Sequence, residues 1–131
     1  MKRLNKLYWL KKEIEQLEMQ IKELTILSAM AMSGMPSGNT VSSPVEKFYD
    51  RLEKLRTKLQ SKLTEYVTEK ERIEDYIESI DDAEVRVIAR LRFIENEDFQ
   101  KIGNEMFMDR TTAYRKLKNY FERNGIDESI H

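Results

Sequence analysis

The sequence predicts an all-α protein, with a long antiparallel helical hairpin (a coiled coil) followed by a small helix-turn-helix domain. Among 131 residues, 36% are charged and 40% hydrophobic, with only 4 Gly and 2 Pro, which is typical of long surface-exposed helices. Apolar residues recur at alternating steps of three and four over two long stretches, the spacing of a helical seam. Residues 98–118 contain two short amphipathic segments joined by a tight turn. Together these patterns favour helices throughout.

The first expected helix runs from about Leu4 to Leu27. Its seam consists of Leu7, Leu10, Ile14, Leu17, Ile21 and Leu24, and good helix formers fill most other positions. From Ser28 to Ser43 the pattern is replaced by SAMAMSGMPSGNTVSS, which predicts a flexible loop at about residues 28–43.

A second long helix is expected to start at Pro44, with Ser43 as its N-cap and Glu46 completing a capping box. Its seam consists of Val45, Phe48, Leu52, Leu55, Leu59, Leu63, Tyr66, Ile73, Ile77 and Ile80. The seam has a stutter around Leu59 and a polar interruption at Lys70. Because an apolar stripe must be covered, the two helices are expected to pair, with surplus stripe packing on the C-terminal domain or on another subunit.

Three shorter helices are expected next. An Asp81–Glu84 capping box starts the first at about Asp82, and residues 96–98 separate it from the second, which begins at Glu97 or Asp98. The third runs from Arg110 toward Arg123 and stops at Asn124-Gly125, with glycine in the left-handed conformation. The predicted organisation is a coiled-coil hairpin at 1–80, a helix-turn-helix domain at 81–125 and a tail at 126–131.

The stretch 98–118 carries the functional prediction. Ile102 and Met106 share one face beside Gly103, Phe107 and Met108 form the corner, and Asp109 stands at the N-cap of the next helix. On that helix Ala113 and Leu117 are expected to face inward. The residues left outside, and expected to contact DNA, are Arg110, Thr111, Thr112, Tyr114, Arg115 and Lys118.

The charge distribution supports this prediction, although the net charge of the chain is only −1. Residues 81–109 hold eight acids and four bases, a net charge of −4, whereas residues 110–123 hold five bases and one acid, a net charge of +4. Positive charge is therefore concentrated on the expected recognition helix, where phosphates would lie. The alternative interpretation of this run is a solvated helix face.

The stretch AEVRVIARLRFIENEDFQKIGNEMFMDRTTAYRKLK resembles region 4 of bacterial sigma factors over about residues 82–121. Leu91-Arg92-Phe93, Phe99, Ile102-Gly103, Met108-Asp109 and Ala113 through Leu117 carry the resemblance, while Phe107 stands where that family usually has Gly. With the coiled coil added, residues 45–123 are similar to small phage and prophage proteins of Gram-positive bacteria, relatives of the ArpU- and RinA-type late-gene regulators. The resemblance implies a sequence-specific, DNA-binding transcriptional regulator that binds double-stranded DNA, with RNA polymerase as a further possible partner of the coiled coil.

Several classes are disfavoured. Cys is absent and the single His is His131, so the sequence offers no metal site, no catalytic His or Cys and no cofactor motif, and we expect no enzyme. We expect neither a membrane span nor a signal peptide, and a cytoplasmic location, which is the host bacterial cytoplasm if a phage encodes the chain.

Two other functions stay open. Small terminase subunits, which recognise phage DNA for packaging, also join a helix-turn-helix to a coiled-coil oligomerisation element, and a purely structural coiled coil would not bind DNA. The coiled coil also makes a homo-oligomer possible. Trp9 is expected to be either a buried residue or an interaction anchor. Arg90 and Arg92 are expected either to form ion pairs with Glu95, Glu97 or Asp98, or to contact phosphate or polymerase.

Overall fold

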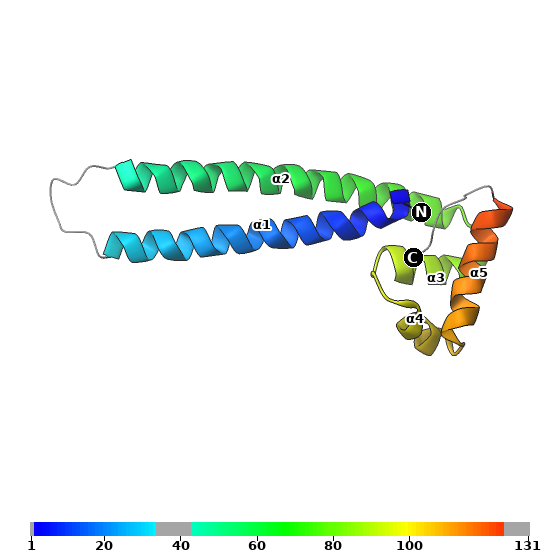
Figure 1. Cartoon of the computed structure of the whole chain (residues 1–131). Coiled ribbons are helices and arrows are strands. Elements are labelled where there is room, and N and C mark those ends of the chain that lie inside the picture. Colours follow the sequence, from blue (N-terminus) through cyan, green and yellow to red (C-terminus); the bar gives the residue numbers. More distant parts are fainter. Residues whose placement is uncertain (1, 34–42, 125–131) are drawn as a thin grey trace. The chain divides into compact units, whose positions relative to one another are not determined.

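The computed structural model describes residues 2–33 and 43–124, and the side chains of residues 5–31 and 45–124. These residues form five helices: α1 (Lys2–Ser33), α2 (Ser43–Glu78), α3 (Ala83–Phe93), α4 (Phe99–Met106) and α5 (Arg110–Arg123) (Figure 1). The described ranges contain no strand. The predicted all-α class is confirmed.

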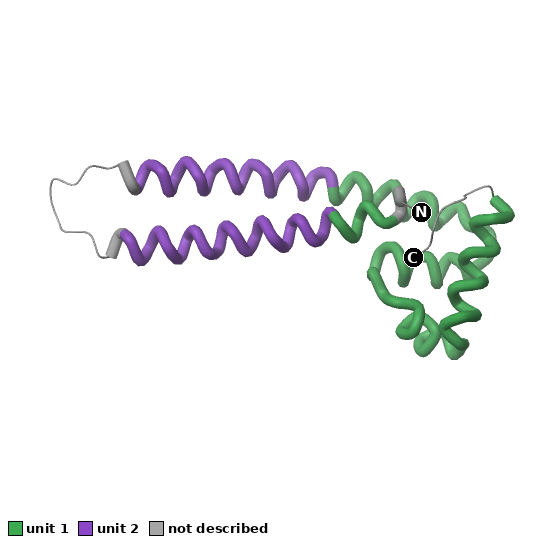
Figure 2. Tube along the Cα trace, viewed as in Figure 1, with its two compact units in different colours: residues 1–9, 66–131 green, residues 10–65 purple. Residues whose placement is uncertain are grey.

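The chain divides into two compact units (Figure 2). Unit 1 consists of residues 1–9 and 66–131, and unit 2 of residues 10–65. The division therefore falls within α1 and α2, whereas the sequence places a domain boundary between residues 80 and 81. Unit 1 takes in both the start of α1 and the end of α2 because side chains from these segments belong to its core.

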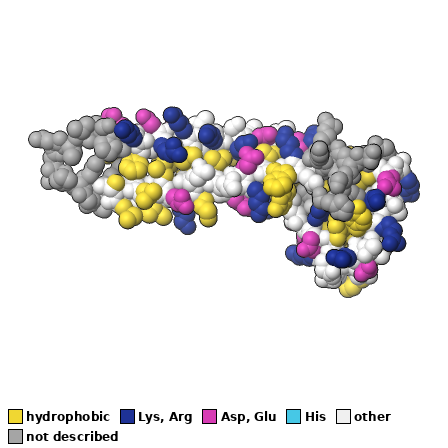
Figure 3. Space-filling model, viewed as in Figure 1, with side chains coloured by type: hydrophobic (Ala, Val, Ile, Leu, Met, Phe, Trp, Pro, Cys, Tyr) yellow, Lys and Arg dark blue, Asp and Glu magenta, His cyan; other side chains and the backbone are white. Residues whose placement is uncertain are grey.

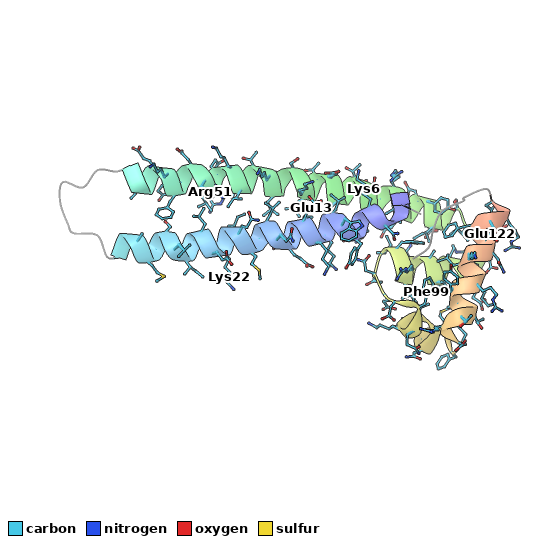
Figure 4. All side chains as sticks on the ribbon, in the orientation of Figure 1. Lys6, Glu13, Lys22, Arg51, Phe99 and Glu122 are labelled. Atoms are coloured by element: carbon cyan, nitrogen blue, oxygen red, sulfur yellow. The ribbon has the colours of Figure 1, made fainter. Side chains whose placement is uncertain are left out.

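Unit 2 is a pair of helical segments that lie side by side and run in opposite directions (Figure 2). Of its seam residues only Leu10, Ile14 and Leu55 are buried, and most of the others are half-buried. An ion pair joins the helices, with 2.8 Å between Lys62 Nζ and Glu13 Oε2; Glu13 is labelled in Figure 4. Leu63, next to the predicted stutter, is 39% exposed. Two helices alone therefore leave much of this seam in contact with water, and hydrophobic side chains are visible along unit 2 in Figure 3.

The first helix ends later than the sequence pattern predicts. α1 continues through Ser33, past the expected end at Leu27, so residues 28–33 are helical and not loop. The apolar seam stops at Leu24, but Ala and Met are strong helix formers, and the sequence carries no breaker before Gly34. The rest of the predicted loop, and the predicted tail at 126–131, lie outside the described residues. α2 begins at Ser43, one residue before Pro44, the expected first residue of the helix.

Unit 1 encloses a core built from all five helices. Its fully buried side chains include Leu7 from α1, Ile73 and Ile77 from α2, Ile88 and Phe93 from α3, Ile102 from α4, and Leu117 and Phe121 from α5. Phe121 stacks on Tyr76 with 6.3 Å between ring centroids and meets Phe93 edge-on at 6.0 Å. Aromatic and branched aliphatic groups thus fill the centre, where close packing gives the largest stabilisation per residue.

Two local predictions need correction. Asp82, and not Asp81, is the N-cap of α3: its carboxylate accepts hydrogen bonds from the backbone N–H groups of Glu84 at 2.9 Å and Val85 at 3.2 Å. The helix accordingly begins at Ala83, one residue later than expected, because the extended backbone needed at an N-cap occurs at Asp82. Trp9 is not buried, since 62% of its surface is exposed and its ring contacts that of Tyr8 edge-on.

Candidate nucleic-acid interface

The candidate site starts with α4, whose first turn is fixed by Asp98. The Asp98 carboxylate accepts a hydrogen bond from the Lys101 backbone N–H at 2.8 Å, which satisfies one of the free donors at the helix start. Asp98, one of the two predicted starts, is therefore the N-cap, and the helix itself begins at Phe99. With the helix anchored there, Ile102 and Gly103 lie on its buried face and Met106 is half-buried against the core.

Gly103 lies where α4 meets the chain that enters α5. A Cβ atom placed on Gly103 would lie 2.7 Å from the Met108 carbonyl oxygen and 3.1 Å from the Arg110 backbone nitrogen. Both neighbours are backbone atoms, which cannot move aside as a flexible side chain can. The close approach of the two helices that the sequence predicts at Gly103 is therefore present and depends on the absence of a side chain.

The turn between the helices is closed by Phe107 in the left-handed conformation, with φ 56° and ψ 43°. The Gly103 carbonyl oxygen accepts hydrogen bonds from the backbone N–H groups of both Phe107 and Met108, and the Met108 bond measures 2.9 Å. Gly or Asn usually adopts this conformation, because the Cβ atom of other residues lies too close to the following carbonyl oxygen. The Phe107 side chain is 97% exposed, so its bulk meets no neighbour, and the corner stays tight without the glycine.

Asp109 occupies the N-cap position of α5 with extended backbone, as predicted, but its carboxylate forms no capping hydrogen bond. The expected stabilisation of the helix start by this side chain is therefore absent. A helix start whose first N–H groups lack a side-chain cap attracts anions.

Two faces of α5 are clearly separated. Ala113, Leu117, Tyr120 and Phe121 are buried in the core of unit 1. Thr111, Arg115 and Lys118 are exposed and follow one another at steps of four and three, so they form one outward stripe, which we call the α5 stripe. Arg110 is exposed at the start of the helix. The structure thus brings four of the six predicted contact residues to the surface of one helix.

The other two predicted residues, Thr112 and Tyr114, are half-buried. Tyr114 packs edge-on against Phe99 of α4, with 5.3 Å between ring centroids, and the Arg92 guanidinium lies 4.9 Å from the centre of the Phe99 ring (Figure 4 labels Phe99). Tyr114 is therefore held in place between helices as well as being partly accessible. Sequence reasoning missed this Arg92–Phe99–Tyr114 cluster, because residues on three separate helices leave no periodic signal.

Burial lowers the pKa of the Arg92 guanidinium, and the charge of Asp98 opposes that shift. One Arg92 nitrogen donates to the Glu97 backbone carbonyl at 3.1 Å. Arg90 pairs instead with Glu74 at 3.4 Å and Glu78 at 3.6 Å. Arg90 thus forms ion pairs, as one of the two interpretations predicts, but the predicted partners are wrong because its carboxylate partners lie on α2.

Part of the positive charge of α5 is already neutralised. The Lys116 ammonium lies 2.5 Å from a Glu84 carboxylate oxygen on α3, and this hydrogen-bonded carboxylate raises the pKa of Lys116. Lys118 lies 4.0 Å from Glu122, the residue labelled near the end of α5 in Figure 4. Within the described ranges neither Arg110 nor Arg115 takes part in an ion pair. These two guanidiniums are therefore the strongest candidates for phosphate or base contacts.

Two features are absent from the described part of the chain. No group of three or more His, Cys, Asp or Glu side chains there is placed to hold a metal ion. None of the described helices combines the length and the apolar character needed to cross a membrane.

Comparison of the chain with protein-family models, with curated proteins and with solved structures finds no match.

Proposed function

We propose that the chain is a sequence-specific DNA-binding regulator of transcription that uses α4, the turn and α5 as a helix-turn-helix. In this proposal α5 enters the major groove, Arg115 and Thr111 contact base edges, and Arg110 and Lys118 contact phosphates. The observation that carries the proposal is the α5 stripe, together with Arg110, which forms no ion pair within the described ranges. The close approach of the chain at Gly103 holds the start of α5 against α4. An exposed helix face with unpaired guanidiniums matches the width and the acceptor pattern of the major groove.

The resemblance to sigma factor region 4 and to late-gene regulators of phages supports the same proposal. It assigns the helical hairpin formed by α1 and α2 to oligomerisation or to contact with RNA polymerase. The half-exposed seam of unit 2 favours such a role, because a stripe of this kind is stabilised when another helix covers it.

The test uses the full chain and duplex DNA. Selection from random duplexes should yield a preferred site, and affinity for that site should fall steeply with salt. We expect Arg115→Ala to weaken specific binding by roughly 1 to 3 kcal/mol if the guanidinium makes a bidentate base contact. An affinity loss that is equal for all sequences, with a salt slope lower by about 1, would instead assign Arg115 to a phosphate.

Arg56→Ala is the matched control, because Arg56 is an exposed arginine of α2 in unit 2 and its loss changes the net charge equally. Circular dichroism should show both variants folded, since exposed substitutions change stability by about 0.5 kcal/mol or less. Parental binding by Arg115→Ala and by Thr111→Ala would mean that α5 is not the recognition helix.

Light scattering separates the proposal from its alternatives. A monomer or dimer supports regulation, whereas a ring of many subunits would support a DNA-packaging role. Absence of DNA binding at low salt would leave a structural coiled-coil protein.

A further inference from the structure

Unit 1 carries a groove between the end of α2, α3 and the end of α4. Its volume is about 470 Å³, and none of the residues proposed to contact DNA lines it. This volume falls in the range of sites that accommodate a few side chains of a ligand. The groove has an apolar floor and acidic walls, which are considered in turn.

The floor is formed by Val87 and Leu91 of α3, with Ile77 of α2 beneath. Val87 is 46% exposed, although it lies on a helix whose other face closes the core of unit 1, and Leu91 is only half-buried. Because the two residues are four positions apart, they lie side by side along one face of α3. An apolar strip of this kind is available to cover the side chains of another segment.

The walls carry more negative than positive charge. Glu78, Glu95, Glu97 and Glu105 line the groove together with Arg86 and Arg90. Arg90 is engaged by Glu74 and Glu78, and an Arg86 nitrogen donates to the Ile80 carbonyl at 2.6 Å. Glu97 Oε1 lies 3.4 Å from the Lys101 ammonium, and the four glutamates that line the groove outnumber its two arginines.

Glu97 shows the imbalance most directly. Its side chain is only 12% exposed, and its Oε2 atom is buried and has no hydrogen-bond partner among the described residues. Leaving a buried charged oxygen without a donor is costly. Desolvation, then a side-chain hydrogen bond with Glu97 and the negative charges of Glu97 and Glu95, raise the pKa of Glu105, with Lys101 opposing the shift. A cation in the groove would pair with the buried Glu97 oxygen and would stabilise the ionised form of Glu105.

We propose that this groove binds a basic amphipathic peptide segment of a partner protein. Lysine or arginine side chains of that segment pair with Glu95, Glu97 and Glu105, and its apolar side chains cover Val87 and Leu91. Charge complementarity selects this occupant: the carboxylates repel nucleic acid, and the described residues offer no metal site that a bare cation would fill. The proposal stands independently of the DNA-binding function.

The experiment uses the full chain labelled with ¹⁵N and a synthetic amphipathic peptide of alternating leucine and lysine pairs at helical spacing. A second peptide with glutamate in place of lysine is the matched probe. We expect the lysine peptide to shift the amide resonances of α3 and of residues 95–105, with an affinity that falls as salt rises. The glutamate peptide should not bind.

Charge-neutral variants then test the walls and the floor. Glu95→Gln and Glu105→Gln should each weaken binding about two- to fivefold, as expected for exposed ion pairs. Val87→Ser should weaken it as well, through loss of apolar contact. Glu46→Gln in unit 2 is the control and should leave affinity unchanged, as should Arg115→Ala, which separates this site from the DNA-binding face.

Three results would overturn the proposal. The lysine peptide fails to bind, or it shifts resonances away from α3 and residues 95–105, or the glutamine variants bind it like the parent chain. Sedimentation of the chain alone tests whether a second copy occupies the groove. If the chain forms a dimer, and Val87→Ser and Glu105→Gln dissociate it, the groove binds a second copy and not a partner peptide.

Discussion

Unit 1 and unit 2 are built from equally regular helical patterns, yet they bury their apolar residues to different extents. In unit 1, Ile73, Ile77, Ile88, Ile102 and Leu117 are almost fully buried. In unit 2, seam residues with the same spacing, such as Leu17, Leu24 and Leu59, are only half-buried. Periodicity therefore reports which face of a helix is apolar, whereas the number of elements packed on that face decides how deeply it is buried.

The difference has a simple physical origin. A helix pair covers one side of each seam residue, and the flanks stay in contact with water. In unit 1, α5 contacts both α3 and α4, and segments of α1 and α2 add further side chains to the same core. Each central residue is then surrounded, which removes nearly all its surface from water and supports close packing.

Matched leucine truncations give the largest effect that separates the two units. Leu117→Ala should lower the free energy of unfolding of unit 1 by roughly 2 to 5 kcal/mol, because it leaves a cavity in a closed core. Leu59→Ala should lower that of unit 2 by only about 1 kcal/mol, since half of the side chain is already in water. Native-state hydrogen exchange measures both, because it reports the opening of α5 and of α2 separately. Equal losses would show that the seam of unit 2 is covered in solution by another chain.

The Gly103 crossing provides the second test. Gly103→Ala should lower the stability of unit 1 by roughly 1 to 3 kcal/mol, because the added Cβ meets backbone atoms that have to shift, and Gly103→Leu should lower it further. Thermal unfolding followed by circular dichroism is the measurement. Asn104→Ala, at the exposed neighbouring position, should change stability by about 0.5 kcal/mol or less. If both alanine variants behave alike, the two helices do not approach closely at residue 103.

The smallest effect concerns Phe107, whose left-handed backbone conformation is costly for a residue with a large side chain. Phe107→Gly should raise the stability of unit 1 by roughly 0.5 to 1 kcal/mol, because glycine removes the cost of the left-handed conformation but gains freedom in the unfolded chain. Phe107→Ala keeps the conformational cost and should be close to neutral. A decrease in stability on Phe107→Gly, measured by urea unfolding, would reveal that the exposed ring is held by a contact.

Much of the fold followed from local signals. The starts of α2, α4 and α5 were predictable to within one or two residues from short polar residues that precede apolar periodicity. The late end of α1 was not, because the apolar seam ends several residues before the helix does. The sequence also could not show that Asp82 and not Asp81 is the N-cap of α3. Two adjacent aspartates offer the same capping chemistry, and only the backbone geometry distinguishes them.

The candidate site was predictable to a similar extent. The inward positions Ala113 and Leu117 and the outward positions Arg115 and Lys118 follow from helical spacing alone. The pairing of Lys116 with Glu84 and the packing of Tyr114 on Phe99 join residues on different helices, so no spacing rule reveals them. The positive charge counted on α5 from the sequence is consequently larger than the charge that remains available to bind a ligand, because part of it is already paired within the chain.

The place of Leu7 in the core of unit 1 has a consequence for how the chain acquires its structure. Leu7 meets partners that lie beyond residue 72, with the whole of unit 2 between them in the chain. Contacts among α3, α4 and α5 are local and can form quickly, but the contact of Leu7 requires closure of a long loop, whose entropic cost rises with its length. Pairing of the helices of unit 2 shortens that loop. The paired helices of unit 2 should therefore lower the entropic cost of bringing Leu7 to the core residues between positions 73 and 121.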